Sequence, residues 1–220
     1  MSSSVADRQG ARVRGATLVE LVIVIVVSAI LFIVTPILVF HGVKTLVFLP
    51  KALAVNHIAT EAMHQVIEGG FSTLSGQTTI QGLRFAVRRS SSDPAIWFAK
   101  ADSVGFLTSD GQYVRIRLVG NVIKRGVRTP STTCTTDLSS LTEEDIPYHA
   151  SGSVQIIPTG SLFLYYDSGG NVITPLGSGC PPATTIRRVD IAFTAQTGGG
   201  NFDQGDARED IASSVAIRVP

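Results

Sequence analysis

The chain has 220 residues, of which 16% are charged, and its formal net charge is +1. A net charge so close to zero gives no bulk electrostatic basis for nucleic-acid binding, and we predict no nucleic-acid partner. The mean hydropathy of +0.29 argues against both intrinsic disorder and a soluble cytosolic enzyme. The presence of only two cysteines excludes a disulfide-rich miniprotein and a four-cysteine zinc site.

A long apolar segment without charged residues lies near the N-terminus, from Leu21 to Val43. As an α-helix it would measure about 35 Å, which is enough to cross the hydrocarbon core of a bilayer. Residues 1–15 carry three arginines and one aspartate, so the positive-inside rule predicts a cytoplasmic N-terminus and an exported C-terminal part. A secretory signal peptide would have a shorter apolar core, of about 7–15 residues. A plain membrane anchor would suit the segment equally well, whereas a buried helix of a globular core is rarely so long and uniform.

An acidic residue, Glu20, stands at the start of this apolar segment. Residues 14–36 read RGATLVELVIVIVVSAILFIVTP. The basic leader, the glycine, the glutamate five positions later and the long apolar run together resemble the N-terminal segment of type IV prepilins and type II secretion pseudopilins. The resemblance implies that a prepilin peptidase cleaves between Gly15 and Ala16 and that the new N-terminus is methylated. The family usually has phenylalanine where this chain has Ala16.

Cleavage would create a charged amine at Ala16, and Glu20 of a neighbouring subunit would neutralise it in an assembled filament. Two unpaired charges in an apolar environment are costly, so such an ion pair would fix the register between subunits. The simpler alternative is that Glu20 only reaches the lipid headgroups. Loss of the leader would leave 15 Lys and Arg against 16 Asp and Glu, a formal net charge of −1.

The helical pattern continues beyond the membrane segment. Apolar residues at helical spacing predict one buried face, formed by Val55, Ile58, Ala62 and Val66. Because Gly69-Gly70 is a typical helix end, one helix is predicted from about Ala16 to Glu68, kinked or broken at Pro36 and Pro50. A second helix is predicted at about 77–89.

After Ser90 the apolar pattern changes to the period of two that is typical of strands. Strands are predicted at 114–118, 162–166, 189–194 and 215–219, turns at 110–111, 120–121 and 169–171, and surface loops at 128–153 and 197–210. The predicted fold class is α+β: a long N-terminal helix, membrane-spanning in its first half and amphipathic in its second, packed on an antiparallel β-sheet head. The expected parts are a cytoplasmic leader (1–15), a transmembrane or filament-core helix (16–43), its amphipathic continuation (44–70) and an extracytoplasmic globular head (71–220).

Three groups of residues are candidates for structural or metal chemistry. Cys134 and Cys180 lie in the exported part, and we predict that they form a disulfide, with two free thiols as the alternative. The other groups are candidate metal ligands, for which ordinary solvated positions are the favoured interpretation. They comprise His57, Glu61 and His64 on the helix, and Asp203, Asp206, Glu209 and Asp210 in an acidic loop that would suit calcium. Motifs of hydrolases, nucleotide-binding proteins and zinc proteases are absent, so we predict neither catalytic residues nor a cofactor.

The resemblance implies a structural subunit of a type IV pilus or type II secretion pseudopilus, and a minor subunit rather than a major one. Stretches at 68–89 and 213–218 resemble J-type minor pseudopilins and related minor pilins. The implied partners are prepilin peptidase, other pilin or pseudopilin subunits, an inner-membrane assembly platform and the lipid bilayer. The implied location is the inner membrane, with the head in the periplasm, and then the filament. The alternative function is a single-pass membrane-anchored periplasmic binding or sensing domain.

Overall fold

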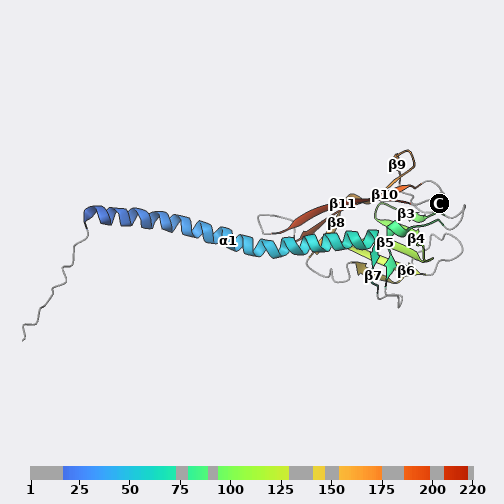
Figure 1. The fold of residues 1–220 in the computed structure, drawn as a ribbon, viewed down its shortest axis with the longest axis horizontal. Coiled ribbons are helices and arrows are strands. Elements are labelled where there is room, and N and C mark those ends of the chain that lie inside the picture. The colour runs from blue at the N-terminus through green and yellow to red at the C-terminus, as the bar shows by residue number, and fades with distance from the viewer. Residues whose placement is uncertain are drawn as a thin grey trace, which may run out of the picture. The chain divides into compact units, whose positions relative to one another are not determined.

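The computed structural model describes residues 17–72, 79–88, 94–128, 141–146, 154–174, 186–198 and 206–217. The chain divides into two compact units, Met1–Leu46 and Val47–Pro220, and we call the second unit the head. The predicted α+β class is confirmed, because one long N-terminal helix is followed by antiparallel sheets, and within the head the helix packs on them (Figure 1).

Helix α1 runs without a break from Leu18 to Ile67 (Figure 1). The sequence predicted a kink or a break at Pro36 and Pro50, and the helix is broken at neither of them. Each proline removes one backbone donor, but the residues on both sides of it remain helical. The helix ends where the sequence predicts, because Gly69 follows with a positive φ of 93°, a conformation that favours glycine.

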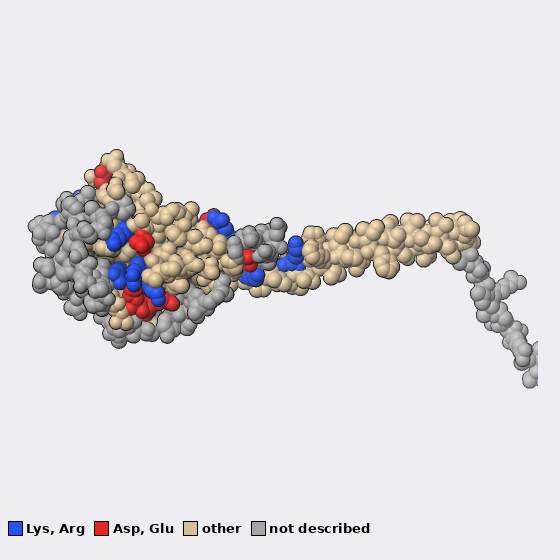
Figure 2. All heavy atoms as spheres, turned by 180° about the vertical axis from the view of Figure 1, so that it is seen from behind, with Lys and Arg blue, Asp and Glu red and all other residues tan. Residues whose placement is uncertain are grey.

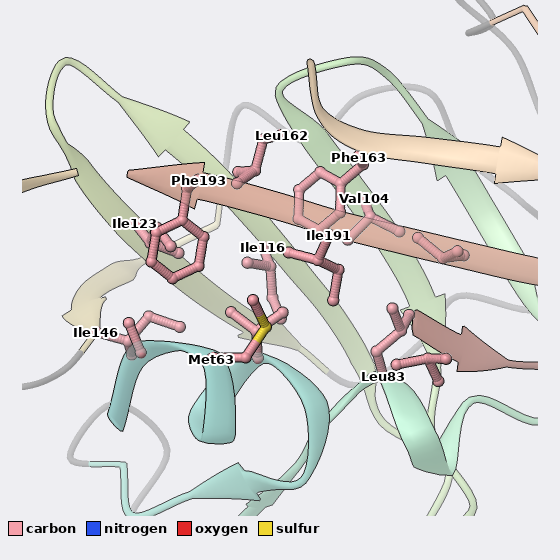
Figure 3. Close-up of a cluster of buried hydrophobic side chains, with 14 of the residues drawn as sticks. Met63, Leu83, Val104, Ile116, Ile123, Ile146, Leu162, Phe163, Ile191 and Phe193 are labelled. Atoms are coloured by element: carbon pink, nitrogen blue, oxygen red, sulfur yellow. The ribbon is translucent and has the colours of Figure 1, made fainter. Parts of the chain in front are cut away.

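The part of α1 that belongs to the head buries one face. Three of the four residues predicted for this face, Val55, Ala62 and Val66, are buried, and Ile58 is partly buried. Met63 lies on the same side, and Figure 3 shows it pointing towards side chains of the sheets such as Ile116 and Ile191. The amphipathic pattern therefore places the helix on the hydrophobic core of the head.

The first large sheet has five antiparallel strands in chain order. They are β3 (Ile96–Ala99), β4 (Ser103–Leu107), β5 (Tyr113–Val119), β6 (Val122–Arg128) and β7 (Glu143–Ile146). The predicted turns at 110–111 and 120–121 join β4 to β5 and β5 to β6. Gly111 and Gly120 have the positive φ values, 83° and 61°, that such turns need.

The second large sheet has four antiparallel strands in the order β11-β10-β8-β9. Their bounds are β8 (Val154–Tyr166), β9 (Val172–Ile173), β10 (Arg188–Thr197) and β11 (Arg208–Ala216). The strands predicted at 162–166 and 189–194 are confirmed and are longer than predicted. The strand predicted at 215–219 is confirmed only as far as Ala216, and it begins at Arg208, inside the loop predicted at 197–210.

The two large sheets are joined through the turn between β3 and β4. Tyr165 of β8 is fully buried, and its hydroxyl donates towards the carbonyl oxygens of Lys100 and Ser103, at 2.9 and 3.0 Å. The amide of Phe163 donates to Ala101 O at 3.0 Å. Burial raises the pKa of Tyr165 well above its ordinary value of 10.0, so this hydroxyl remains a donor at physiological pH.

The second predicted helix, at 77–89, is wrong. The described part of this segment forms strand β2 (Ile80–Gln81), which pairs with β1 (Gly69–Gly70), and a short 3₁₀ helix, η1 (Leu83–Phe85). Gly82 explains the difference. Its amide donates to the carbonyl of Glu68 at the end of α1, and a Cβ on Gly82 would lie 2.4 Å from Ile67 O. Tertiary contact with the helix end overrides the local helical pattern.

The loop predicted at 128–153 is also wrong in part, because β7 lies inside it. β7 carries Glu143, Glu144 and Asp145, which are poor strand formers by propensity. They pair with basic residues of neighbouring strands, and these ion pairs supply the stabilisation that propensity lacks.

Candidate functional site

The first unit consists, in its described part, of the N-terminal portion of α1, and its side chains are exposed. The apolar residues from Leu18 onwards are exposed, Phe32 by 82%, and none of the most apolar stretch is buried within the chain. By length and composition, this helix is apolar enough to cross a membrane. Figure 2 shows an uninterrupted run of uncharged residues along it. An apolar surface of this size needs a cover outside the chain, which can be lipid or other apolar helices.

The acid at the start of the helix, Glu20, forms a reciprocal pair of hydrogen bonds with Thr17. The amide of Thr17 donates to Glu20 Oε2 at 2.8 Å, and the amide of Glu20 donates to Thr17 Oγ1 at 3.3 Å. This arrangement is a capping box, which satisfies two amide groups at the helix N-terminus. The carboxylate is also favoured there by the helix dipole. The motif Thr-x-x-Glu at 17–20 is the sequence signal for this cap, which our prediction did not include.

The other end of the uncharged segment is marked by Lys44. Its Nζ lies 4.7 Å from the centre of the Phe40 ring, which itself contacts the His41 ring edge to face. A lysine that covers an aromatic ring keeps its charged end at the boundary of an apolar region. The helix therefore has one charged residue at each boundary of the apolar segment, Glu20 and Lys44.

The other residues predicted from the sequence are those of the processing site, the disulfide and the two candidate metal sites. Gly15, Ala16, Cys134 and Cys180 lie outside the described residues, so the processing site and the disulfide stay predictions. Among the described residues no three His, Cys, Asp or Glu side chains are grouped so that they could hold a metal ion. Of the candidate metal ligands, Asp203 lies outside the described residues, His57 and His64 are exposed, and Glu209 is partly exposed. Glu61 accepts a hydrogen bond from Gln65, Asp206 pairs with Lys51, and Asp210 pairs with Arg208.

A cluster of ion pairs on β5, β6 and β7 was not predicted from the sequence. On one face of the sheet Glu143 accepts hydrogen bonds from both Arg115 and Arg117, with closest distances of 2.5 and 2.6 Å. Beside it Lys124 Nζ lies 2.6 Å from Asp145 Oδ1. Figure 2 shows basic and acidic side chains adjoining on the surface of the head. The strand period of two brings these charges to one face, and only the observed register of β7 shows which of them pair.

A further ion pair lies on the opposite face of the same sheet, inside the core. Arg125 is 1% exposed, and its Nε and Nη2 donate to Glu144 Oε1 at 3.0 and 2.6 Å. Nη2 also donates to the carbonyl of Phe71 at 2.6 Å. The guanidinium therefore joins β6 to β7 and to the segment that follows α1. A buried pair of this kind is costly to break, because one charge stays buried after its counter-charge is removed.

The charge cluster makes stability depend on pH. Burial by itself would raise the pKa of Glu143, but the hydrogen bonds and charges of Arg117 and Arg115 outweigh it, and the pKa lies below the ordinary value of 4.5. The unfolded chain therefore binds a proton at Glu143 more tightly than the folded chain does. The stabilisation is complete above pH 4.5, and it is lost as the pH falls through the lower pKa that Glu143 has in the folded chain. We expect the free energy of unfolding to decrease below pH 4.5, and less steeply in Glu143→Gln, as measured by urea unfolding in detergent. An unchanged pH dependence in this variant would contradict the assignment.

Comparisons with protein-family models, with curated proteins and with solved structures gave no match. The function of the chain therefore has to be inferred from its own residues and geometry.

Proposed function

We propose that this chain is a structural subunit of a filament of the type IV pilus or type II secretion pseudopilus class, and a minor subunit rather than a major one. The observation that carries the proposal is the exposed apolar portion of α1 with a single acid at its start. The basic leader that ends in Gly15 supports it, as does the packing of the second half of α1 on an antiparallel head.

The proposed mechanism begins with cleavage after Gly15 by a prepilin peptidase. The mature chain would then wait in the inner membrane with its head in the periplasm, and lipid would cover the apolar helix. On assembly, helices of other subunits would replace lipid as the cover. In an apolar filament core the new amine at Ala16 needs a counter-charge, and Glu20 of a neighbouring subunit would supply it.

The capping box gives Thr17 a part in this mechanism. In the single chain the Glu20 carboxylate is held at the helix N-terminus by the Thr17 amide, next in sequence to Ala16. A carboxylate held in this way lies at the end of the helix where a neighbour's amine would approach. The bonding of Glu20 within its own chain also means that a simple leucine substitution would remove two interactions at once, the helix cap and the proposed ion pair.

Two substitutions of Glu20 separate the cap from the ion pair. Glutamine keeps the capping-box pattern and removes the charge, whereas leucine removes both. We expect filament assembly to fall about a hundred-fold or more in both variants, since breaking a buried ion pair costs about 3–5 kcal/mol. Membrane insertion of both variants should be retained. Assembly is measured as the fraction of mature chain that sediments as filaments after shearing from cells.

Wild-type assembly by Glu20→Gln would show that the helix cap, and not the charge, is what Glu20 contributes. The N-terminal mass of the native membrane-bound chain tests the wider proposal. A species that begins at Ala16 is expected. Retention of Met1 would favour the alternative, a single-pass membrane-anchored periplasmic binding or sensing domain.

A further inference from the structure

We propose that strand β7 is exchanged between copies of this chain in the assembled state, so that residues 141–146 of one copy dock on β6 of a second copy. Exchange needs a high local concentration of heads, and for this the proposal rests on the proposed filament function. It concerns a surface with no part in the helix-based assembly mechanism, namely the edge of the five-stranded sheet.

The exchanged segment is held by its own side chains on both faces of the sheet. Glu143 and Asp145 pair with Arg115, Arg117 and Lys124 on the outer face. On the core face Glu144 pairs with Arg125, and Ile146, which is 1% exposed, packs in the hydrophobic core. Leu141, just before the strand, packs on a second hydrophobic cluster formed by Trp97, Phe98, Leu107 and Tyr113.

The site that receives the segment is formed by β5 and β6 and is complementary to it. Among the described strands, β6 alone pairs with β7, with Gly126 opposite Glu143 and Ile123 opposite Ile146. The receiving strands present four cations, and the segment presents three carboxylates between two apolar ends. Backbone pairing gives affinity, and the alternating charged and apolar contacts give specificity for this segment.

The connection from β6 to β7 is longer than the pairing of two adjacent antiparallel strands requires. Fourteen residues separate β6 from β7 and seven separate β7 from β8, whereas the adjacent pair β5 and β6 is joined by two residues. Fully extended, seven residues reach about 23 Å and fourteen about 46 Å. If the predicted Cys134–Cys180 disulfide forms, the eight residues from 135 to 142 still reach about 26 Å. These lengths let the segment lie up to about 23 Å from the start of its own β8, so exchange requires the β6 of a second head within that distance.

The local concentration of heads decides whether β7 docks on β6 of its own chain or on β6 of a second copy. Exchange replaces each contact by the identical contact in another copy, so the two arrangements differ mainly in chain entropy and in the cost of association. A tethered strand meets its own site at an effective concentration in the millimolar range, and heads fixed side by side in a filament present foreign sites at a comparable concentration. Exchange is therefore expected in the assembled protein and not in dilute dispersed chains.

Isotope-mixed cross-linking tests the proposal with native residues. Equal amounts of ¹⁴N- and ¹⁵N-labelled full-length chains are assembled together and treated with a carbodiimide, which joins an amine directly to a carboxylate in contact. The Lys124–Asp145 pair, at 2.6 Å, should then give mixed-isotope peptides, as abundant as same-isotope peptides when exchange is complete. The Lys51–Asp206 pair, at 3.3 Å, serves as the internal control and should give same-isotope peptides only. The variant Lys124→Arg keeps the positive charge but removes the amine, so the Lys124–Asp145 cross-link should disappear.

The outcomes separate this proposal from the filament proposal. Filaments that give only same-isotope Lys124–Asp145 peptides would overturn strand exchange and leave the filament function standing. A cross-link from Lys124 to a carboxylate of a different protein would also overturn it. If no filaments form, the same peptides are read from concentrated full-length chains in detergent micelles. Mixed-isotope peptides there would support exchange even though the filament function had failed, and their absence would refute exchange as well.

Discussion

Replacement of Arg125 by methionine is expected to lower the free energy of unfolding by about 3–5 kcal/mol. Methionine has a similar length but no charge, so the buried Glu144 would lose its ion pair with Arg125. The carbonyl of Phe71 would lose its donor as well. The measurement is urea unfolding of the full-length chain in detergent, followed by the fluorescence of Trp97, which is the only tryptophan and is buried in the head.

Two variants make the Arg125 result specific. Arg117→Met also removes an arginine from the same sheet, but its side chain is 40% exposed and Glu143 keeps Arg115, so the expected loss is below about 1 kcal/mol. The double replacement of Arg125 by methionine and Glu144 by leucine removes both buried charges and should recover most of the stability. Unfolding of Arg125→Met at the wild-type urea concentration would refute the assigned role.

Replacement of Gly69 by alanine is expected to destabilise the head by about 3 kcal/mol or more. Gly69 has φ 93°, which is unfavourable for any residue with a Cβ. A Cβ at this position would also lie 1.9 Å from the carbonyl oxygen of Ile80, and a backbone atom in a paired strand has no room to move. The end of α1 and strand β2 would have to separate, which the same urea experiment would detect.

The matched control for Gly69 is Gly170, in the turn between β8 and β9. It has a similar φ of 79°, but an added Cβ would meet no atom within 4 Å. Gly170→Ala therefore reports the conformational cost alone, about 1–2 kcal/mol. If the two alanine variants lost the same stability, the close approach of β2 to the helix end would contribute nothing, contrary to expectation.

The sequence was sufficient to predict the elements that depend on local periodicity. The run of apolar residues from Leu21, the buried stripe at 55–66 and the glycine stop at Gly69 together defined a helix whose observed ends differ by at most two residues from those predicted. The alternating apolar patterns at β5, β8 and β10 were likewise sufficient to predict these strands. In each case one face of a helix or strand contacts the core, and the spacing of the apolar residues along the sequence identifies that face.

The elements that depend on distant contacts were not predictable in this way. The segment around Gly82 has a helical pattern, yet it is extended because its backbone lies against the end of α1. Strand β7 has three consecutive acids, and only the cations of β5 and β6 make it a strand. Of the candidate site, the apolar helix and Glu20 were evident from the sequence. The capping bond to Thr17 was available from a short motif, whereas the buried pair of Arg125 and Glu144 required the sheet register.

The attachment of α1 to the head has a mechanical consequence. Directly after the helix, Gly69 and Gly70 pair with β2, the amide of Gly82 bonds to Glu68, and the Phe71 carbonyl is held by Arg125. Tension applied along α1 would be carried first by the packing of its buried face on the sheets, and these bonds would hold the C-terminal end of the helix in addition. Through Arg125 part of the force that reaches this end would pass to β6 and β7, so the buried guanidinium is expected to add to the resistance to pulling.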